Sequence, residues 1–233
     1  HETYGIPFIA ETKTLMYRKD WFEAEGVEPY KTYDEIPTSA KALTKDAQGR
    51  SLNDPEHGDP VQWGFCFLDP NMLGYGFMEA YAPAWGGRIV DPDTFEPTFD
   101  EPQMIEALEW LSKVWKSGVI PTGSPSLSFL DAIDYYKNNQ VAAIEQWAVN
   151  IREIIQIAEM KDKVGWSICP RKVRSGTTHA GWAAVIPHNV ADPGPAWEFI
   201  KWATNTETQK KIVKEVPVHS TGRYSIMKWD EHP

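Results

Sequence analysis

Short apolar runs alternate with amphipathic segments along this chain, and the alternation predicts a mixed α/β protein. The runs have the length and the β-branched and aromatic content of buried strands; they read YGIPFIA, LMYR, VQWGFCF, VAAIEQ, VGWSICP and GWAAVIP. Between them lie stretches with apolar residues three and four positions apart, which is the spacing of one helix face. Strands separated by helices are typical of α/β folds.

The opening segment predicts a strand, a break near Glu11-Thr12, a second strand and then a short helix that ends at Gly26. The clearest helix is expected over residues 102–117. Its predicted core stripe has 3.6-residue spacing and consists of Met104, Ile105, Leu108, Leu111, Val114 and Trp115. Four tryptophans at helical spacing are assigned to packing: Trp110, Trp115, Trp197 and Trp202.

Composition and charge narrow the range of functions. The formal net charge of −10 argues against nucleic acid as a partner, because phosphate binding relies on clustered Lys and Arg. No apolar run approaches the roughly 18 residues that a membrane span needs, so direct membrane insertion is not expected. Cys66 and Cys169 are too few for a disulfide framework. They are interpreted as two buried thiols, with a single bridge as the alternative if the chain is exported.

Tryptophan is unusually abundant, with 11 residues among 233. An excess of tryptophan serves either core packing or flat apolar platforms for ligands, and sugars stack their C–H faces on such rings. The sequence contains no nucleophile elbow, HExxH, P-loop or GxGxxG motif. No cofactor and no metal site are predicted. An enzymatic function is therefore not expected.

An ordered set of motifs resembles the extracellular solute-binding proteins of sugar ABC importers, the maltodextrin-binding-protein-like family 1. The most specific part is the opening, where YGIPF, ET and LMYRKDWF over residues 4–22 match the pattern GIP…E…LxYNKDLF, with Arg18 in place of the usual Asn. Later segments match in the same order: YAPAWGG at 81–87, QVAAIEQW at 140–147, AGWAAVIP at 180–187 and AWEFIKW at 196–202. The match covers nearly the whole chain.

The resemblance implies a type II periplasmic-binding-protein-like fold, in which a solute lies between two lobes that close about hinge strands. Residues 1–177 would form mainly the second lobe, with a first hinge near Ile9–Thr12. Residues 178–233 would contain a second hinge near Thr177–Gly181 and a returning fragment of the first lobe. Most of the first lobe would be missing, so the chain is expected to be truncated relative to the family.

The resemblance also implies the solute-binding residues. Trp147 is the main candidate platform, followed by Trp182 beside Gly181, and Tyr75 with Phe77 as its competitor. Glu11 matches a solute-contacting carboxylate at the first hinge. The remaining candidates are Asn71, Glu145, Gln146 and Arg223, with His219 in the same loop as Arg223. Core packing is the alternative for the tryptophans, and a hinge ion pair is the alternative for Glu11. For the other polar residues the alternative is a surface or capping role.

The function that follows is capture of a sugar or oligosaccharide and its delivery to the membrane permease of an ABC importer. The implied location is periplasmic or extracellular, with or without a lipid anchor on a preceding segment. Two other functions stay open. The same fold could bind a non-sugar solute such as a polyamine, surrounded by carboxylates and aromatic rings. A glycoside hydrolase would need two facing carboxylates, and Glu11 and Glu145 are the only pair that could be nominated.

Overall fold

The computed structural model describes residues 3–67, 76–216 and 220–228 and divides the chain into two compact units. Unit 1 contains residues 1–12, 147–153 and 179–233, and unit 2 contains residues 13–146 and 154–178. The predicted division placed residues 1–177 mainly in the second lobe, with a first hinge near Ile9–Thr12. Of that range, the structure groups residues 1–12 and 147–153 with unit 1. The assignment of the units to two lobes of a binding protein stays a prediction.

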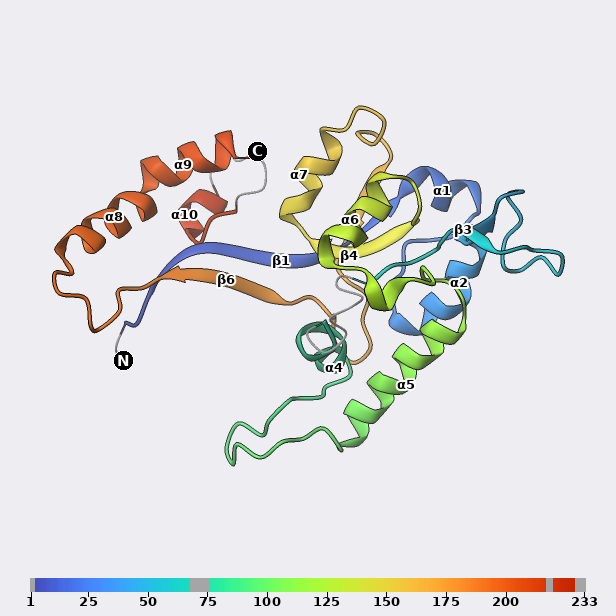
Figure 1. Cartoon of the computed structure of the whole chain (residues 1–233), viewed down its shortest axis with the longest axis horizontal. Coiled ribbons are helices and arrows are strands. Elements are labelled where there is room, and N and C mark those ends of the chain that lie inside the picture. Colours follow the sequence, from blue (N-terminus) through green and yellow to red (C-terminus); the bar gives the residue numbers. More distant parts are fainter. Residues whose placement is uncertain (1–2, 68–75, 217–219, 229–233) are drawn as a thin grey trace. The chain divides into compact units, whose positions relative to one another are not determined.

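Strand β1 (Ile6–Arg18) belongs to both units and pairs with a different strand in each. In unit 1 its first half runs antiparallel to β6 (His179–Ala184), with Ala10 opposite Gly181 and Thr12 opposite His179 (Figure 1). In unit 2 its second half lies between β4 (Ala143–Trp147) and β5 (Val164–Ser167). The predicted break near Glu11-Thr12 is therefore wrong, because backbone pairing continues through these polar residues. The register shifts instead between Pro7 and Ile9, and a bulge tolerates a proline that cannot donate a ladder hydrogen bond.

Helices and turns complete unit 2 around this sheet. The helices are α1 (Lys19–Ala24), α2 (Ile36–Leu43), α4 (Ala82–Ala84), α5 (Pro102–Lys116) and α6 (Phe129–Lys137). The shorter turns are 3₁₀ segments at Tyr33–Glu35 and Ser124–Ser126 and a π-helical turn, η2, at Phe77–Tyr81. A small antiparallel pair joins β2 (Lys45–Asp46) to β3 (Pro60–Gln62). Gly26 follows α1 with a φ of 64°, as expected of a residue that ends a helix.

Within the described residues, unit 1 contains three complete helices in addition to the strand pair of β1 and β6. They are α8 (Gly194–Thr204), α9 (Thr206–Glu215) and α10 (Tyr224–Met227). Helix α7 (Val149–Ile155) begins in unit 1 and ends in unit 2. No helix of the described residues combines the length and the apolar character needed to cross a membrane.

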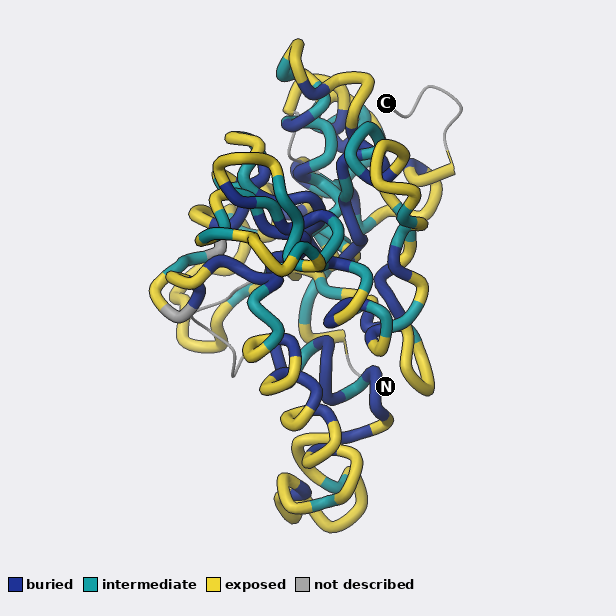
Figure 2. The backbone as a smooth tube through the Cα atoms, turned by 90° about the vertical axis from the view of Figure 1, so that its right-hand side faces the viewer, coloured by how far each residue is buried: buried dark blue, intermediate teal, exposed yellow. Residues whose placement is uncertain are grey.

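The core of unit 2 is an aromatic cluster centred on Tyr33 and Trp110. Their rings lie 4.9 Å apart, and the indole N–H of Trp110 donates to the Tyr33 carbonyl at 2.8 Å. Tyr81 and Trp85 complete the cluster, with ring centroids 5.4 and 5.0 Å from Trp110. Figure 2 shows the buried residues in dark blue. Cys66 and Cys169 are buried and unbridged, in agreement with the interpretation as two thiols.

Helix α5 forms where predicted, but part of its predicted core stripe is wrong. The buried residues are Met104, Ala107, Trp110, Leu111 and Val114, whereas Ile105 and Leu108 are about half exposed. The helix is rotated toward Trp110, whose ring fills the space beside Tyr33. The assignment of four tryptophans to packing is confirmed for Trp110 only. Trp115, Trp197 and Trp202 are exposed by 39, 44 and 58%.

Candidate functional site

The structure places the predicted site residues in both units. Unit 1 holds Glu11, Trp147, Gly181, Trp182 and Arg223, and unit 2 holds Glu145 and Gln146. Asn71, Tyr75 and His219 lie outside the described residues. Phe77, the competitor of Tyr75, begins the π-helical turn and is buried.

A hollow of about 470 Å³ lies around Glu11 within unit 1. Its lining comes from β1, β6, the junction between β4 and α7, the segment before α10 and the end of α10: Ala10, Glu11, Thr12, Ala148, Val149, His179, Ser220, Thr221 and Met227. Hydrogen bonds to main-chain carbonyls hold these segments together. The Ala148 N–H donates to the Thr12 carbonyl at 2.9 Å, and the Ser220 hydroxyl donates to the Ala10 carbonyl at 2.6 Å. Segments distant in sequence thus present, among the described lining residues, one carboxylate, one imidazole and three hydroxyls beside apolar side chains.

Partial burial changes the acid–base behaviour of Glu11. Its side chain is half-buried, and the loss of hydration raises the pKa of this carboxyl above the ordinary 4.5. The ionised form can only accept hydrogen bonds, so it suits a solute that brings hydroxyl donors.

This raised pKa predicts that solute affinity falls on acidification. Protonation of Glu11 replaces an acceptor by a donor, and it occurs at a higher pH than for an ordinary glutamate. The dissociation constant, measured by calorimetry from pH 7.5 to 4.5, should therefore rise. Glu11→Gln should bind more weakly at pH 7.5, by about 1.5–3 kcal/mol, and should show a flatter pH profile. A variant profile as steep as the wild-type profile would assign the pH dependence to another group.

The two candidate tryptophans lie near the hollow but do not line it. Trp147 ends β4, is half-buried, and directly precedes Ala148 in the hollow wall. Trp182 stands on β6 opposite Ile9 and is 68% exposed. Its neighbour Gly181 permits a close strand approach, because a Cβ there would lie 2.6 Å from the Ile9 carbonyl oxygen. Arg223 is exposed at the start of α10, with its N–H donating to the Thr221 hydroxyl at 3.1 Å.

Glu145 and Gln146 are fully buried in unit 2. The Tyr33 hydroxyl donates to Glu145 Oε1 at 2.8 Å, and burial raises the pKa of the Glu145 carboxyl. The ammonium of Lys13 lies near enough to oppose this rise through its charge. Glu145 therefore has a structural role in unit 2, and its contact with a solute stays a prediction.

The buried carboxyl of Glu145 predicts a pH-dependent stability. Between its ordinary pKa of 4.5 and its raised folded pKa, the folded state binds a proton that the unfolded state releases. Stability from this group is consequently lost as pH rises through that window. Relative to Glu145→Gln, the wild type should lose free energy of unfolding between pH 4.5 and 8, as measured by denaturant titration. Parallel pH profiles of the two proteins would contradict this assignment.

Sequence reasoning missed Lys13 and Glu79, which form an ion pair within unit 2. The Lys13 ammonium lies 3.0 Å from Glu79 Oε2, and the side chains are 1 and 26% exposed. The sequence contained a partial signal, since Lys13 lies two positions before the apolar strand run that begins at Leu15.

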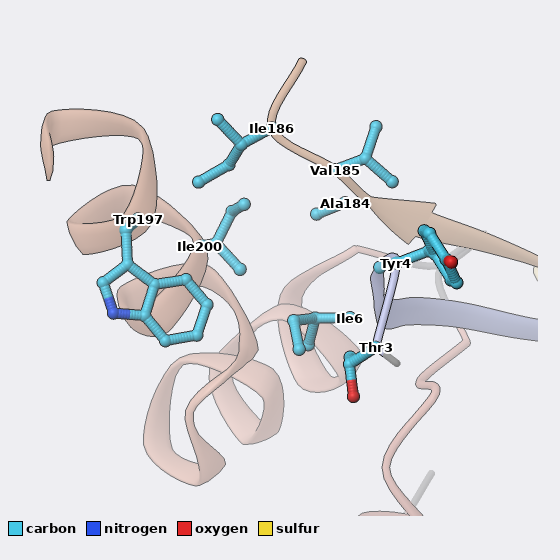
Figure 3. A pocket seen from close by; sticks show the side chains of 9 residues that line it. Thr3, Tyr4, Ile6, Ala184, Val185, Ile186, Trp197 and Ile200 are labelled. Atoms are coloured by element: carbon cyan, nitrogen blue, oxygen red, sulfur yellow. The ribbon is translucent and has the colours of Figure 1, made fainter. Parts of the chain in front are cut away.

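A second hollow in unit 1, of about 310 Å³, is lined mainly by apolar residues (Figure 3). Ile6 of β1 faces Trp197 and Ile200 of α8 across it, with Ala184 to Ile186 on a further side. It lacks the convergent polar groups that orient a hydroxylated solute. Among the described residues, no group of three or more His, Cys, Asp or Glu side chains is placed to hold a metal ion.

Comparison with known proteins supports the family resemblance that the sequence motifs indicated. The sequence model of the bacterial extracellular solute-binding protein family matches residues 1–224. The chain belongs to this family. The family is composed of solute-binding proteins rather than enzymes, and its members are extracellular by description. The predicted family resemblance is thereby confirmed.

Two curated relatives in the family bind sugars or sugar alcohols by name. The mannitol-binding protein of Pseudomonas aeruginosa is 26% identical over 218 residues, which are 90% of this chain and 47% of that protein. The maltotriose-binding protein of Pyrococcus abyssi is 24% identical over 235 residues, covering 91% of this chain and 43% of that protein. The chain thus spans about half the length of these relatives.

Solved structures confirm the predicted fold class. The solute-binding protein of Agrobacterium vitis with bound D-mannitol matches with a TM-score of 0.73 and 24% identity, over 92% of this chain and 50% of that one. Maltose-bound MalE3 of T. maritima matches with a TM-score of 0.79 and 23% identity, over 97% of this chain and 56% of that one. The family member described here therefore has the type II periplasmic-binding-protein-like fold.

Proposed function

We propose that this chain is part of a protein that binds a sugar or sugar alcohol and delivers it to the permease of an ABC importer. The observation that carries the proposal is the hollow at Glu11, where a half-buried carboxylate and the Ser220 and Thr221 hydroxyls meet apolar walls. Such a mixture suits hydroxylated solutes, which need both polar partners and C–H contacts. The named solutes of the curated relatives, mannitol and maltotriose, are of this class.

The roles of individual residues follow from their positions. Glu11 would accept hydrogen bonds from solute hydroxyls, and Trp147 would supply a stacking face beside the hollow. Trp182, Gly181 and Arg223 would contribute from β6 and from the start of α10. Asn71, Tyr75, Glu145 and Gln146, which belong to unit 2, remain candidates. Unit 2 would correspond to the second lobe of the family, and unit 1 to part of the first.

The alternatives fit the described residues less well. A polyamine site gathers several carboxylates and aromatic rings around its cations, whereas Glu11 is the only carboxylate among the described residues that line this hollow. Glycoside hydrolysis needs a second carboxylate with access to the sugar and to water. Glu145, the nominated partner, is 1% exposed and hydrogen-bonded to Tyr33. We therefore propose a binding protein without catalytic activity, located in the periplasm or outside the cell, with or without a lipid anchor.

Thermal unfolding of the complete gene product with candidate solutes tests this function. A solute present at 100 times its Kd should raise the free energy of unfolding by about 2.7 kcal/mol, which shifts the melting temperature upward. Mannitol, ribitol, maltose and maltotriose form a suitable panel, with spermidine as the comparison. Stabilisation by spermidine and by none of the sugars would overturn the proposal.

A further inference from the structure

Glu79 stands in the middle of the π-helical turn η2, which replaces the ordinary helix over Phe77–Tyr81. Such turns are rare and often occur at functional sites. The turn buries Phe77, Ala80 and Tyr81 in the core of unit 2, while the Glu79 side chain keeps 26% of its surface exposed. The turn therefore holds one carboxylate at the surface of unit 2 with its neighbours anchored beneath it.

Several contacts within unit 2 hold Glu79 in place. Lys13 extends a side chain that is only 1% exposed and places its ammonium 3.0 Å from Glu79 Oε2. The Thr178 hydroxyl donates to the Glu79 carbonyl at 2.6 Å, and the Lys13 N–H donates to the Thr178 carbonyl at 3.2 Å. Residues 13 and 178 are the points at which two segments of the chain enter and leave unit 2. Glu79 is thus tied to both segments.

The other oxygen of Glu79 has a different environment. Within the described residues no hydrogen bond is donated to Oε1, so one oxygen is held by Lys13 and one is available to a ligand. A carboxylate has no proton to donate and can only accept hydrogen bonds. Because this acceptor is already oriented, a bound hydroxyl gains a charge-assisted hydrogen bond at little cost in side-chain entropy.

We propose that Glu79 contacts the solute, and that Lys13 is the positioning residue that orients it. The inference rests on the proposed function and deepens it by naming a selective group on unit 2. Glu79 accepts from hydroxyl groups and repels a carboxylate, so it favours neutral sugars and sugar alcohols over the corresponding sugar acids. A purely structural Glu79 would neutralise the buried Lys13 and would leave solute affinity unaffected.

The test is calorimetry of the complete gene product with whichever member of the sugar panel the wild type binds, and with the corresponding sugar acid. Glu79→Gln should raise the Kd for the neutral solute about 10- to 100-fold, the loss expected for a hydrogen bond to a charged acceptor. Glu79→Gln should also reduce the ratio of the Kd for the sugar acid to the Kd for the neutral solute. Glu106→Gln, an exposed carboxylate of α5 in the same unit, is the matched charge control and should bind like the wild type.

A double-mutant cycle tests the positioning role of Lys13. Lys13→Met should weaken binding, and the Lys13→Met/Glu79→Gln protein should bind no more weakly than Glu79→Gln alone, because Lys13 acts through Glu79. If the losses of binding free energy in the two single variants add up in the double variant, Lys13 does not act through Glu79. Unfolding midpoints identify variants that do not fold. If Glu79→Gln is one of them, Glu79→Asp, which retains the charge but is shorter by one methylene, should still raise the Kd.

The outcomes separate this inference from the proposed function. A wild type that binds no member of the panel overturns the proposed function and the inference together. A wild type that binds a sugar, beside folded Glu79 variants with unchanged Kd and unchanged preference over the sugar acid, overturns the role of Glu79 alone.

Discussion

Replacing Trp110 by alanine is expected to lower the free energy of unfolding by about 3–5 kcal/mol, the cost of deleting a large aromatic side chain from a core. The Trp110 ring is 5% exposed and packs against Tyr33, Tyr81 and Trp85. Its N–H also donates to the Tyr33 carbonyl, so the substitution leaves a cavity and a buried carbonyl without its donor. Equilibrium unfolding in urea, followed by circular dichroism, measures the loss.

Trp115→Ala is the matched control, since Trp115 lies on the same helix and is 39% exposed. Its loss should be about 1 kcal/mol or less, in the range of substitutions outside the core. Equal losses for the two variants would mean that α5 presents a different face to the core from the one described.

The second large effect is expected on binding. Trp147→Ala should weaken solute affinity by about 1–3 kcal/mol, the range for losing a stacking platform at the centre of a site. Trp147 ends the buried strand β4 and directly precedes Ala148 in the wall of the Glu11 hollow, so its removal takes away a large apolar face adjoining that wall. Calorimetric titration with the preferred sugar measures the change in Kd.

An exposed tryptophan away from the hollow serves as the control for nonspecific effects of a Trp→Ala substitution on the Kd. Trp166 of β5 is 58% exposed and belongs to unit 2, and Trp166→Ala should leave the Kd unchanged. If Trp147→Ala also binds normally, Trp147 is a packing residue and has no part in the site.

The family and the order of strands and helices were predictable because both depend on local patterns. Apolar runs of strand length, helix stops such as Gly26 and the ordered motifs are each encoded over a few residues. The continuity of β1 was not predictable in the same way. Polar residues around Glu11 indicated a break, but pairing with β6 and then with β5 holds the strand extended through them.

Burial of individual side chains was harder to predict than secondary structure. A helical stripe identifies an apolar face only approximately, and on α5 the bulk of Trp110 placed that residue in the core and left Ile105 and Leu108 partly exposed. The same is true of α8: Trp197 and Trp202 lie at helical spacing with other apolar residues, yet both side chains are exposed.

The candidate site could be predicted only where a residue belongs to a recognisable motif. Glu11 and Trp147 both belong to the family motifs, and the structure places Glu11 in the hollow and Trp147 directly before Ala148 of its wall. Lys13 and Glu79 belong to no motif, are 66 positions apart in sequence, and are brought together only by tertiary packing. Tyr33 and Glu145, 112 positions apart, form a buried hydrogen bond for the same reason.

Calorimetric titration of the complete gene product with mannitol, maltotriose and spermidine tests the central claim most directly. The account predicts saturable heat with at least one of the two carbohydrates and none with spermidine. It also predicts that this heat weakens in Glu11→Gln. Saturable binding of spermidine, together with no heat from either carbohydrate, would contradict the claim that the chain belongs to a sugar-binding protein.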